Sequence, residues 1–524
     1  MLAAERGIQT LRSGVVSKSE TSGNFRPLGR TGRFYKRLNE PLVVVIVALS
    51  LAVLLTWSAK LCLMHNADSI LPALISTQNV TWYFWGQNRF GNLLPALTSW
   101  IWDVDLNLKA QILLRAFCAA LGPVFFILVL RPKAQLITVY CATIAAMIFL
   151  ERDLLAHWYW TDAQPYGTSL AILVPSLLVA SHSWRFNTRS TGIAITVLFL
   201  LTVALWVNLS AVLFALPLFL GLAIIERSGH FFVLAVLLAL AYGLDSAHAA
   251  HVGGNFAYAT FRPSWTATLK AASNLADEIR GLPTLLLAIG AILASWTLRG
   301  RDIIRTASLM LAVSAVVFLV IANLQWVQEN LSLSRYFLIP VTAIVATCAT
   351  LTVEAAEKLM AQAQTWNRVV LPSVSFALLI LAAAPFVLPL NLRCRFISGP
   401  PELAAVVDLV DKTNPSFVDG DYWLVWPAVF LANRDALGPV YGLAYRAEGA
   451  RRPIRRFAAS HPQPVILCIG KPLTDCVDRF ASMLGWRSVS AREIASGALA
   501  DSRLDWVAGV LDYGSQGDSA AHDH

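Results

Sequence analysis

An acidic residue just after the first apolar run is the leading candidate for chemistry in this sequence. Asp68 opens a stretch, residues 68–95, that contains five aromatic residues and is too polar to span a membrane. A carboxylate at a membrane surface can act as a general base toward a hydroxyl group, or can position that group. It can also cap a short helix that begins at Ser69. We expect an amphipathic loop pressed against the membrane, with Asp68 offered to a polar ligand.

Several basic residues are candidates for binding a phosphate group near this acid. Arg335 stands at the start of a late apolar run beside Tyr336, and a guanidinium fork matches phosphate oxygens. An arginine at a helix end can also simply extend its charge to the interface, so both interpretations of Arg335 are open. Arg115 lies about one turn inside an apolar run, where a charge needs a polar cavity or a partner. Lys270 is a further candidate.

Aromatic, amide and acidic side chains gather in the first two polar segments. Aromatic rings can cover the apolar faces of a sugar, while amides and carboxylates bind its hydroxyls. Trp and Tyr are also ordinary anchors at a membrane interface. The candidates for sugar or acceptor binding are Trp85, Gln87, Asn88, Arg89, Glu151, His157 and Asp162.

The sequence offers no convincing metal or nucleotide motif. His248 and His251 are three residues apart, but no carboxylate stands beside them to complete a metal site. No pattern supports ATP-driven transport or zinc proteolysis. Cys394, Cys468 and Cys476 fall in the C-terminal region, so one disulfide can form there if that region lies in an oxidising compartment.

Composition places these candidates in a membrane protein. The chain has 524 residues, of which 56% are hydrophobic and 14% are charged, with a net charge of +9. Soluble domains carry about 25% charged residues. The basic residues stand in short segments between apolar runs, which indicates orientation in a lipid bilayer rather than binding to nucleic acid.

Spans of roughly 20 apolar residues recur along the chain. We predict eleven of them, with a turn at Asn208 dividing residues 191–226 into two. The predicted spans are 41–60, 110–130, 134–150, 167–183, 191–207, 211–226, 231–247, 281–298, 306–323, 336–353 and 369–389.

The basic residues also predict the topology. Residues 1–40 are expected to be a disordered cytoplasmic tail without a cleavable signal peptide. Residues 41–390 then form the transmembrane domain, whose longer connections (61–109, 151–166, 248–280 and 324–335) lie on the outer face. An odd number of spans places residues 391–514 outside, followed by a disordered tail, 515–524. Alanine-rich spans suggest a bacterial inner membrane.

The C-terminal region alternates between helical and extended patterns, which indicates a small α/β domain. The fold class expected for the whole chain is therefore an all-α polytopic membrane protein with a small extracytoplasmic α/β domain. Helices are predicted at Glu402–Lys412 and Leu473–Leu484, and strands at Phe417–Trp426, Pro464–Gly470 and Leu504–Asp512.

Taken together, these features resemble the integral-membrane glycosyltransferases of the C-type (GT-C) superfold, which include protein mannosyltransferases and the lipid A aminoarabinose and galacturonic-acid transferases. The resemblance rests on the span count, on Asp68 after the first span, on the Arg335–Tyr336 pair and on the C-terminal domain. The first loop in that family usually carries two adjacent acids, whereas Ser69 follows Asp68 here. A second acid from Asp103, Asp105 or Glu151 is therefore an open alternative.

The resemblance implies a sugar donor linked to polyprenyl phosphate and an acceptor hydroxyl on an envelope glycan or glycolipid. Arg335, helped by Arg115 or Lys270, would hold the phosphate, and Asp68 would prepare the acceptor. Some relatives use a divalent metal, so metal dependence is left open. A polymerase or ligase, or a transporter of lipid-linked sugars, would share many of these features. A transporter is expected to place its polar residues near the middle of the membrane.

Overall fold

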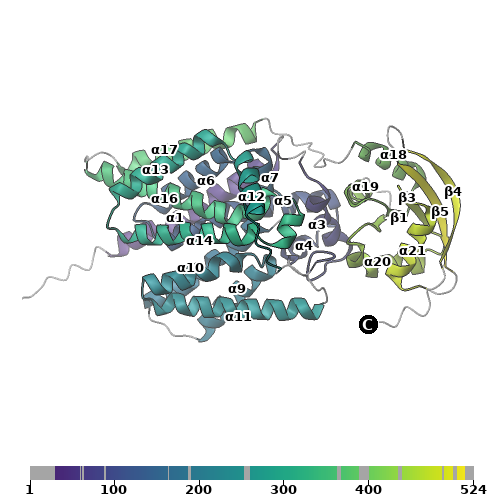
Figure 1. Ribbon diagram of the computed structural model, residues 1–524, viewed down its shortest axis with the longest axis horizontal. Helices are drawn as coiled ribbons and strands as arrows, with labels where there is room; N and C mark the ends of the chain where they lie inside the picture. Colours follow the sequence, from purple (N-terminus) through teal and green to yellow (C-terminus); the bar gives the residue numbers. More distant parts are fainter. Residues whose placement is uncertain are drawn as a thin grey trace, which may run out of the picture.

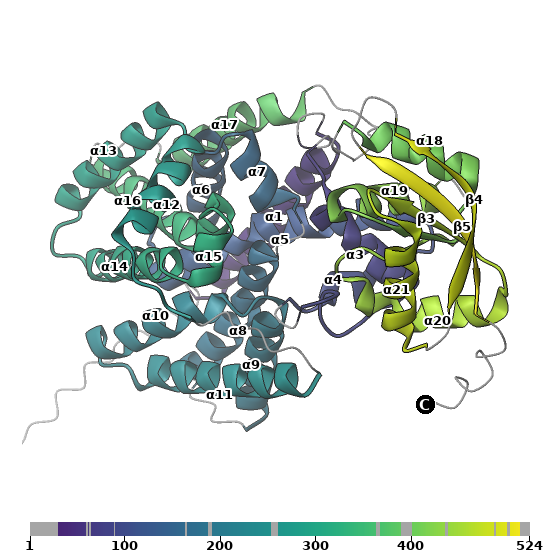
Figure 2. The same cartoon turned by 45° about the vertical axis from the view of Figure 1, so that its right-hand side comes forward.

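The computed structural model describes residues 30–58, 61, 64–87, 90–162, 165–186, 191–252, 260–362, 367–388, 401–434, 439–486, 489–499 and 504–513. Within them, a large bundle of helices is joined to a smaller α/β domain formed by the C-terminal part of the chain (Figure 1). Short helices from the first half of the chain lie between these two parts, as the rotated view in Figure 2 also shows.

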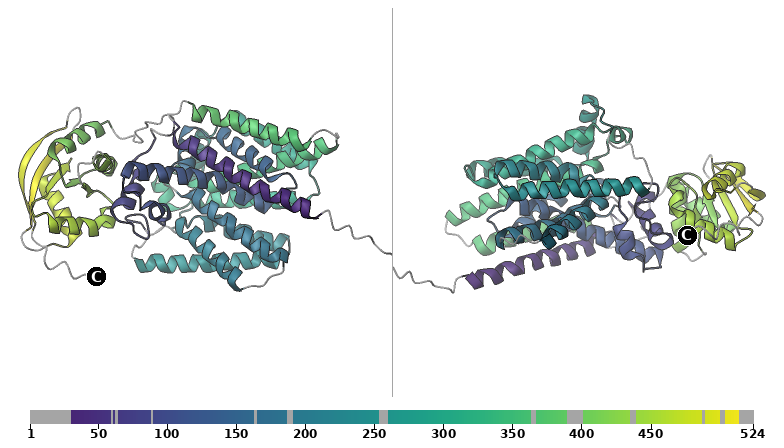
Figure 3. Two further views of the ribbon diagram at one scale, coloured as in Figure 1. Left: turned by 180° about the vertical axis from the view of Figure 1, so that it is seen from behind. Right: turned by 90° about the horizontal axis from the view of Figure 1, so that it is seen from below.

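Each predicted span coincides with an apolar helix among the described residues. The helices are α1 (Arg30–Thr56), α5 (Val104–Leu130), α6 (Leu136–Leu150), α8 (Tyr166–Phe186), α9 (Thr191–Val207), α10 (Ala211–Ile225), α11 (Gly229–Val252), α13 (Gly281–Thr297), α14 (Asp302–Ala322), α16 (Leu338–Gln362) and α17 (Asn367–Val387). Figure 3 shows that the long helices of the bundle run in roughly one direction.

Five of these described helices are long and apolar enough to cross a membrane, namely α5, α11, α14, α17 and α16 together with the turn before it. The apolar parts of the other six are shorter. The chain is thus a helical membrane protein, and the count of eleven spans stays a prediction. Its α1 begins at Arg30, inside the expected tail, whose first 29 residues lie outside the described part.

The predicted turn inside residues 191–226 is confirmed. Helix α9 ends at Val207 and α10 begins at Ala211. Between them the Asn208 side chain accepts hydrogen bonds from the backbone N–H and the hydroxyl of Ser210, at 3.0 and 2.6 Å. Asparagine commonly closes turns in this way because its short amide reaches the backbone two residues on.

The first long connection of the chain, residues 57–103, contains two helices where an amphipathic loop was predicted. Residues Ala67–Gln78 form helix α3, and Leu93–Thr98 form the short α4. The Asn66 side chain caps α3 by accepting hydrogen bonds from the backbone N–H groups of Asp68 and Ser69, at 3.0 and 3.3 Å. Nine residues of α3 are buried, so this segment is part of the protein interior.

The C-terminal domain confirms the predicted α/β class. Its five-stranded sheet has the order β2-β1-β3-β5-β4; β2, β1 and β3 are parallel, and β5 and β4 continue the sheet antiparallel. The elements are α18 (Leu403–Thr413), β1 (Phe417–Asp419), α19 (Tyr422–Arg434), β2 (Tyr441–Gly442), η2 (Ala447–Ala450), α20 (Arg451–Ser460), β3 (Val465–Ile469), α21 (Leu473–Leu484), β4 (Ser490–Ala498) and β5 (Asp505–Asp512).

The strand predicted at Phe417–Trp426 is wrong beyond Asp419. Aromatic and β-branched residues favour extended structure, but Gly420 ends the strand at a point where a Cβ would lie 2.9 Å from the carbonyl oxygen of Ile469. The Asp421 side chain then accepts a hydrogen bond from the backbone N–H of Trp423 at 2.8 Å. This local cap starts helix α19 in place of a longer strand.

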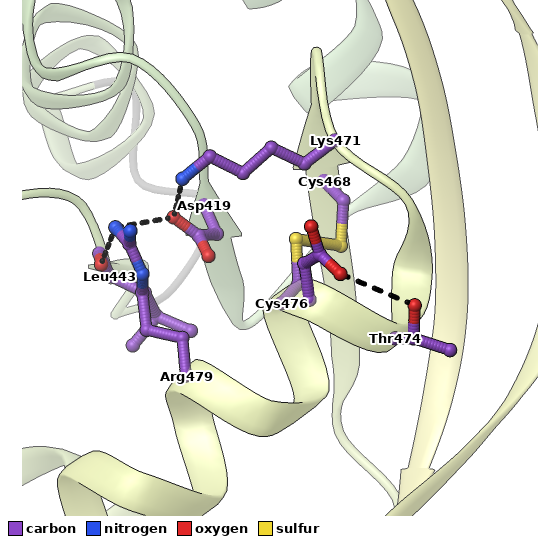
Figure 4. Close-up of a disulfide and its surroundings, with 8 residues drawn as sticks. Asp419, Leu443, Cys468, Lys471, Thr474, Cys476 and Arg479 are labelled. Atoms are coloured by element: carbon purple, nitrogen blue, oxygen red, sulfur yellow. Dashed lines mark hydrogen bonds and ion pairs between the residues drawn. A yellow bond between two sulfur atoms is a disulfide. The ribbon is translucent and has the colours of Figure 1, made fainter.

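A buried ion cluster fixes the carboxyl ends of β1 and β3 (Figure 4). Asp419 is fully buried and pairs with Arg479 at 3.2 Å and Lys471 at 3.5 Å. A disulfide between Cys468 and Cys476 joins β3 to α21 beside it, while Cys394 lies outside the described residues. Asp419, the last residue of β1, is therefore linked both to Lys471, which follows β3, and to Arg479 of α21.

The first long connection and the C-terminal domain share one hydrophobic core. Trp85, only 1% exposed, packs against Trp426 with ring centroids 5.8 Å apart. The Asn79 amide donates to the carbonyl oxygen of Gly449 at 2.7 Å. A Cβ on Gly449 would lie 2.1 Å from the Trp85 ring, so only glycine permits this approach. The domain is thus fixed onto α3.

Candidate functional site

Asp68 lies where the helical bundle, α3 and the C-terminal domain meet. It stands in the first turn of α3, where the helix dipole favours a negative charge. Its Oδ1 accepts hydrogen bonds from the Tyr422 hydroxyl at 2.6 Å and from Arg446 Nη1 at 3.1 Å. Its Oδ2 is 3.7 Å from Arg335 Nη1. One carboxylate is therefore held between two guanidinium groups.

The sheet topology explains why Tyr422 and Arg446 reach this carboxylate. Tyr422 follows strand β1 and Arg446 follows strand β2, and these strands are parallel neighbours. The carboxyl ends of parallel strands meet at one edge of a sheet, which is where open α/β folds place their functional residues. The sequence interpretation missed both residues.

Arg446 is held rigidly by its surroundings. Its φ of +79° is unusual for a residue other than glycine. The guanidinium carbon lies 5.1 Å from the ring centroids of Phe84 and Tyr422 and 5.6 Å from that of Tyr445. Ring faces attract a cation at such distances. A Cβ on Gly86 would lie 3.0 Å from Arg446, so the first long connection closes tightly over this side chain.

Arg335 comes from the helical bundle, in the turn η1 (Ser334–Phe337) that precedes α16. Its Nη2 donates to the Tyr336 hydroxyl at 3.2 Å, and its guanidinium carbon lies 5.2 Å from the centre of that ring. Trp326 packs edge-on against Tyr336 with centroids 4.5 Å apart. The predicted Arg335–Tyr336 pair is thus a positioned unit beside Asp68, although its phosphate-binding role stays a prediction.

These residues line a cavity of about 290 Å³. One part of the wall is polar and the rest is apolar, so a ligand with a charged head and an apolar body would match it. The charged and amide residues in the wall are Asp68, Gln87, Asn92, Arg115, Asn330, Arg335 and Arg446, and the apolar ones include Pro72, Phe84, Phe90, Leu93, Leu94 and Val207.

Tyr422 donates a hydrogen bond to Asp68 and keeps its own proton. Burial raises the pKa of Tyr422 well above its usual value, and the negative charges of Asp68 and Asp162 raise it further, although Arg446 acts in the opposite direction. The hydroxyl therefore stays protonated near neutral pH. Its hydrogen bond fixes the Oδ1 edge of the Asp68 carboxylate and orients Oδ2 toward Arg335.

Asp162 provides a second carboxylate, which is hydrogen-bonded to Ser69. Asp162 is 3% exposed and accepts a hydrogen bond from the Ser69 hydroxyl at 2.7 Å. It also interacts electrostatically with Arg335 and Tyr422. Asp162, predicted only as a sugar-binding residue, is therefore a second acid that interacts with the neighbours of Asp68.

The other acids proposed to complete the site lie elsewhere in the protein. Asp103 caps helix α5, accepting a hydrogen bond from the backbone N–H of Leu106 at 2.7 Å. Asp105 pairs with Lys109 one turn along the same helix, at 2.6 Å. Glu151 is buried and accepts a hydrogen bond from the indole N–H of Trp160 at 2.8 Å. None of these three lines the cavity around Asp68.

The two remaining phosphate-binding candidates have different positions. Arg115 lines the cavity, but its guanidinium also donates to the backbone carbonyls of Ser69 and Thr161, at 3.2 and 3.5 Å. It thereby joins α3 to the end of helix α7 (Asp153–Trp160). Lys270 lies on the exposed side of helix α12 (Trp265–Asp277) and is not part of the cavity wall.

The predicted sugar-binding residues are divided between the cavity and the interior. Gln87 lines the cavity, whereas Asn88 and Arg89 lie outside the described residues. Trp85 is buried in the core shared with the C-terminal domain, so it does not face a ligand. His157 is also buried; its Nδ1 lies 2.9 Å from the Thr161 hydroxyl. Burial lowers the pKa of His157, so this ring stays neutral.

Glu151 gives a prediction about pH. Burial raises its pKa to about 8, so the folded protein binds a proton that the unfolded chain releases near pH 4.5. Stability should therefore decrease as the pH rises from about 5 to 8. The Glu151→Gln variant keeps an acceptor for Trp160 and should lose less stability over this range. Thermal unfolding of both proteins at pH 5.0, 6.5 and 8.0 measures the difference, and identical pH profiles would contradict it.

The described residues do not fit a divalent metal site. Within the described parts of the chain, no three His, Cys, Asp or Glu side chains are close enough together to bind a metal ion. The immediate partners of Asp68 are two arginines and a tyrosine, whose donor groups compete with a cation.

The fold and site define the class of this protein as a helical membrane protein whose C-terminal α/β domain completes a charged cavity. No model of a known protein family matches the chain, and no curated protein matches it.

Proposed function

We propose that this protein is a glycosyltransferase that moves a sugar from a polyprenyl-phosphate-linked donor to a hydroxyl group of an envelope glycan or glycolipid. One observation carries the proposal. Asp68 presents a carboxylate in a cavity between an apolar helical bundle and an α/β domain, with Arg335 only 3.7 Å from its Oδ2. A proton acceptor beside a phosphate-binding group is what this transfer needs.

The two oxygens of Asp68 have separate roles in this mechanism. Oδ1 is occupied by the Tyr422 hydroxyl and by Arg446. Among the described residues, Oδ2 has only the ion pair with Arg335 at 3.7 Å. Since that distance is longer than a hydrogen bond, Oδ2 keeps a lone pair for an incoming hydroxyl group.

The transfer is a single displacement at the anomeric carbon of the donor. The acceptor oxygen forms a bond to this carbon as the bond from the carbon to the phosphate oxygen breaks. The acceptor proton goes to Oδ2 of Asp68, and the electron pair of the broken bond leaves with polyprenyl phosphate. Arg335 stabilises the charge that develops on the phosphate. Attack from the opposite face inverts the configuration of the sugar.

The shape and location of the cavity suit such a donor. Pro72, Leu93 and Leu94 form an apolar wall next to the charged groups, against which a prenyl chain can lie. The cavity wall includes residues of α3 and α4, the short helices that lie between the bundle and the C-terminal domain in Figures 1 and 2. The Cys468–Cys476 disulfide favours an oxidising, extracytoplasmic location for this domain.

A comparison of strains tests the proposal. Envelope glycans are analysed by mass spectrometry in a strain lacking the gene and in the same strain carrying wild type, Arg335→Gln or Arg305→Gln. We expect one defined sugar to be missing in the deletion strain and to return with wild type. With Arg335→Gln it should stay at 10% or less of the wild-type level. The reason is that removing one donor group that stabilises a developing negative charge lowers the rate by about 10²–10³-fold.

Arg305→Gln is the matched control, since this residue is exposed and its contact with Asp302 is a surface pair at 3.9 Å. It should restore the sugar fully at equal expression. If the deletion leaves every glycan unchanged, the transferase proposal fails, and transport of lipid-linked sugars becomes the function to measure.

A further inference from the structure

A second cavity, of about 420 Å³, lies at the far end of helix α5 from Asp68. Arg115 of α5 lines the first cavity, and Arg131, the residue that ends this helix, lines the second. At 1.5 Å per residue these two arginines are roughly 24 Å apart along the helix axis. The hydrocarbon core of a bilayer is about 30 Å thick. The second cavity therefore lies near the opposite side of the bilayer from Asp68.

One part of the wall of this cavity is an ion pair. Arg131 Nη1 donates to Glu226 Oε2 at 2.9 Å and so joins the end of α5 to the turn between α10 and α11. The Arg131 guanidinium carbon also lies 5.0 Å from the centre of the Phe231 ring, which attracts a cation and fixes this side chain at the wall. The Arg131 and Glu226 side chains are 52% and 25% exposed, so a ligand can reach both charges.

Most of the remaining wall is apolar. Leu128 and Val129 come from α5, Leu177 and Leu178 from α8, and Phe231 from α11. The Leu178 side chain is 48% exposed in an otherwise apolar helix, as is expected of a residue that faces lipid chains. A ligand of this cavity would therefore present a polar head group to two opposite charges and an apolar body to the leucines.

The charges of the ion pair select a zwitterionic head group. Phosphate oxygens match the fork of Arg131, and a primary ammonium group has three N–H donors for the carboxylate of Glu226. Within the described part of the chain, their mutual hydrogen bond uses one N–H group and one carboxylate oxygen, so both side chains keep polar atoms for a ligand. The pair itself is neutral. A ligand of one charge would therefore face one repelling group, whereas a zwitterion faces none.

We propose that this cavity binds a phospholipid whose head group carries a phosphate and a primary ammonium group, as in phosphatidylethanolamine. Arg131 binds the phosphate, Glu226 accepts hydrogen bonds from the ammonium group, and the acyl chains lie against Leu177 and Leu178. This lipid joins α5, α8 and the turn between α10 and α11 at the membrane surface. The inference does not depend on the proposed function, because it concerns the other end of the bundle.

Lipid binding to the purified full-length protein in detergent, measured by native mass spectrometry, tests the inference. Phosphatidylethanolamine should bind wild type about 10-fold more tightly than phosphatidylcholine, whose ammonium has no N–H group, or phosphatidylglycerol, which has no ammonium. Arg131→Gln and Glu226→Gln should each weaken phosphatidylethanolamine by about 10-fold, because each removes a charged hydrogen-bonding partner. Arg305→Gln removes an exposed arginine of α14 and should leave all three affinities unchanged.

Two variants separate recognition of the head group from damage to the fold. Glu226→Gln should leave phosphatidylglycerol binding unchanged or make it tighter, because the repelling carboxylate is gone. Equal weakening of both lipids by Glu226→Gln would contradict recognition of the ammonium group. If Arg131→Gln does not fold, Arg131→Lys keeps the charge without the fork and should weaken phosphatidylethanolamine severalfold.

Two other outcomes would overturn the inference. The first is that wild type binds all three lipids equally, or that both glutamine variants bind phosphatidylethanolamine as wild type does, which indicates contact with lipid in general. The second is that glycerophosphoethanolamine, the soluble head group without acyl chains, binds as tightly as the phospholipid, since the ligand would then be a soluble compound. Neither outcome bears on Arg335 or on sugar transfer, so the proposed function is tested separately.

Discussion

The Asp68→Asn variant is expected to lower kcat for sugar transfer by about 10²–10⁴-fold, the usual contribution of a general base. An amide oxygen in place of Oδ1 still accepts hydrogen bonds from Tyr422 and Arg446, so the fold and the docking of the C-terminal domain should persist. The amide nitrogen in place of Oδ2 cannot take a proton from the acceptor, and it faces Arg335 with a donor. Product formation by the purified protein, with its own donor and acceptor, measures the effect.

Asp103→Asn is the control for this measurement. Asp103 belongs to the same connection and caps α5, and asparagine caps helices about as well as aspartate does. Its rate should be close to that of wild type. If Asp68→Asn retains more than one tenth of the wild-type rate at equal stability, Asp68 is not the base. Asp162, which the structure places behind Ser69, is then the next residue to replace.

The Trp85→Ala variant is expected to destabilise the protein by about 3–5 kcal/mol, the usual effect of removing a buried tryptophan. Its ring fills the contact between the first long connection and Trp426, and its indole N–H donates to the carbonyl oxygen of Asn79 at 3.1 Å. Without it, the C-terminal domain should separate more easily from α3. Thermal unfolding and limited proteolysis of the purified protein measure both effects.

This variant also distinguishes two roles for Trp85. A sugar-binding ring would raise KM and leave the unfolding temperature unchanged, whereas a core ring lowers the unfolding temperature. Trp102→Ala, at an 81% exposed position in the same connection, is the control and should change stability by less than about 0.5 kcal/mol. An unchanged unfolding temperature in Trp85→Ala would show that the shared core does not fix the domain.

The helices could be predicted because each depends on a local pattern. An apolar run such as residues 110–130 indicates a helix by its own composition and length, and Asn208 marks a turn by its own chemistry. The start of α3 was harder to see, because the cap is Asn66 and Asp68 only occupies the first turn. The prediction of a strand at Phe417–Trp426 was wrong beyond Asp419 for a related reason. Gly420 ends the strand, and this is visible only from the close approach of Gly420 to Ile469, a residue distant in the sequence.

The site could be predicted only in part, because two of the residues that contact Asp68 come from a domain far away in the sequence. The resemblance to glycosyltransferases implied that Asp68 and Arg335 belong to one site, but not that they form an ion pair. Tyr422 and Arg446 reach Asp68 only when the C-terminal domain docks on α3, and no pattern within a short window reports such docking. Composition also could not separate polar residues that face a cavity, such as Gln87, from those satisfied inside the protein, such as Glu151.

The core shared by the first long connection and the C-terminal domain has a consequence for biosynthesis. The hydrogen bond from Arg446 to Asp68 joins residues that are 378 positions apart in the chain. At about 5–20 residues per second, the ribosome needs roughly 20–75 s to make the segment between them. During that time Trp85 and Asp68 have no partners from the last domain. A nascent or truncated chain therefore leaves this face of α3 without the packing and charged partners that the last domain supplies.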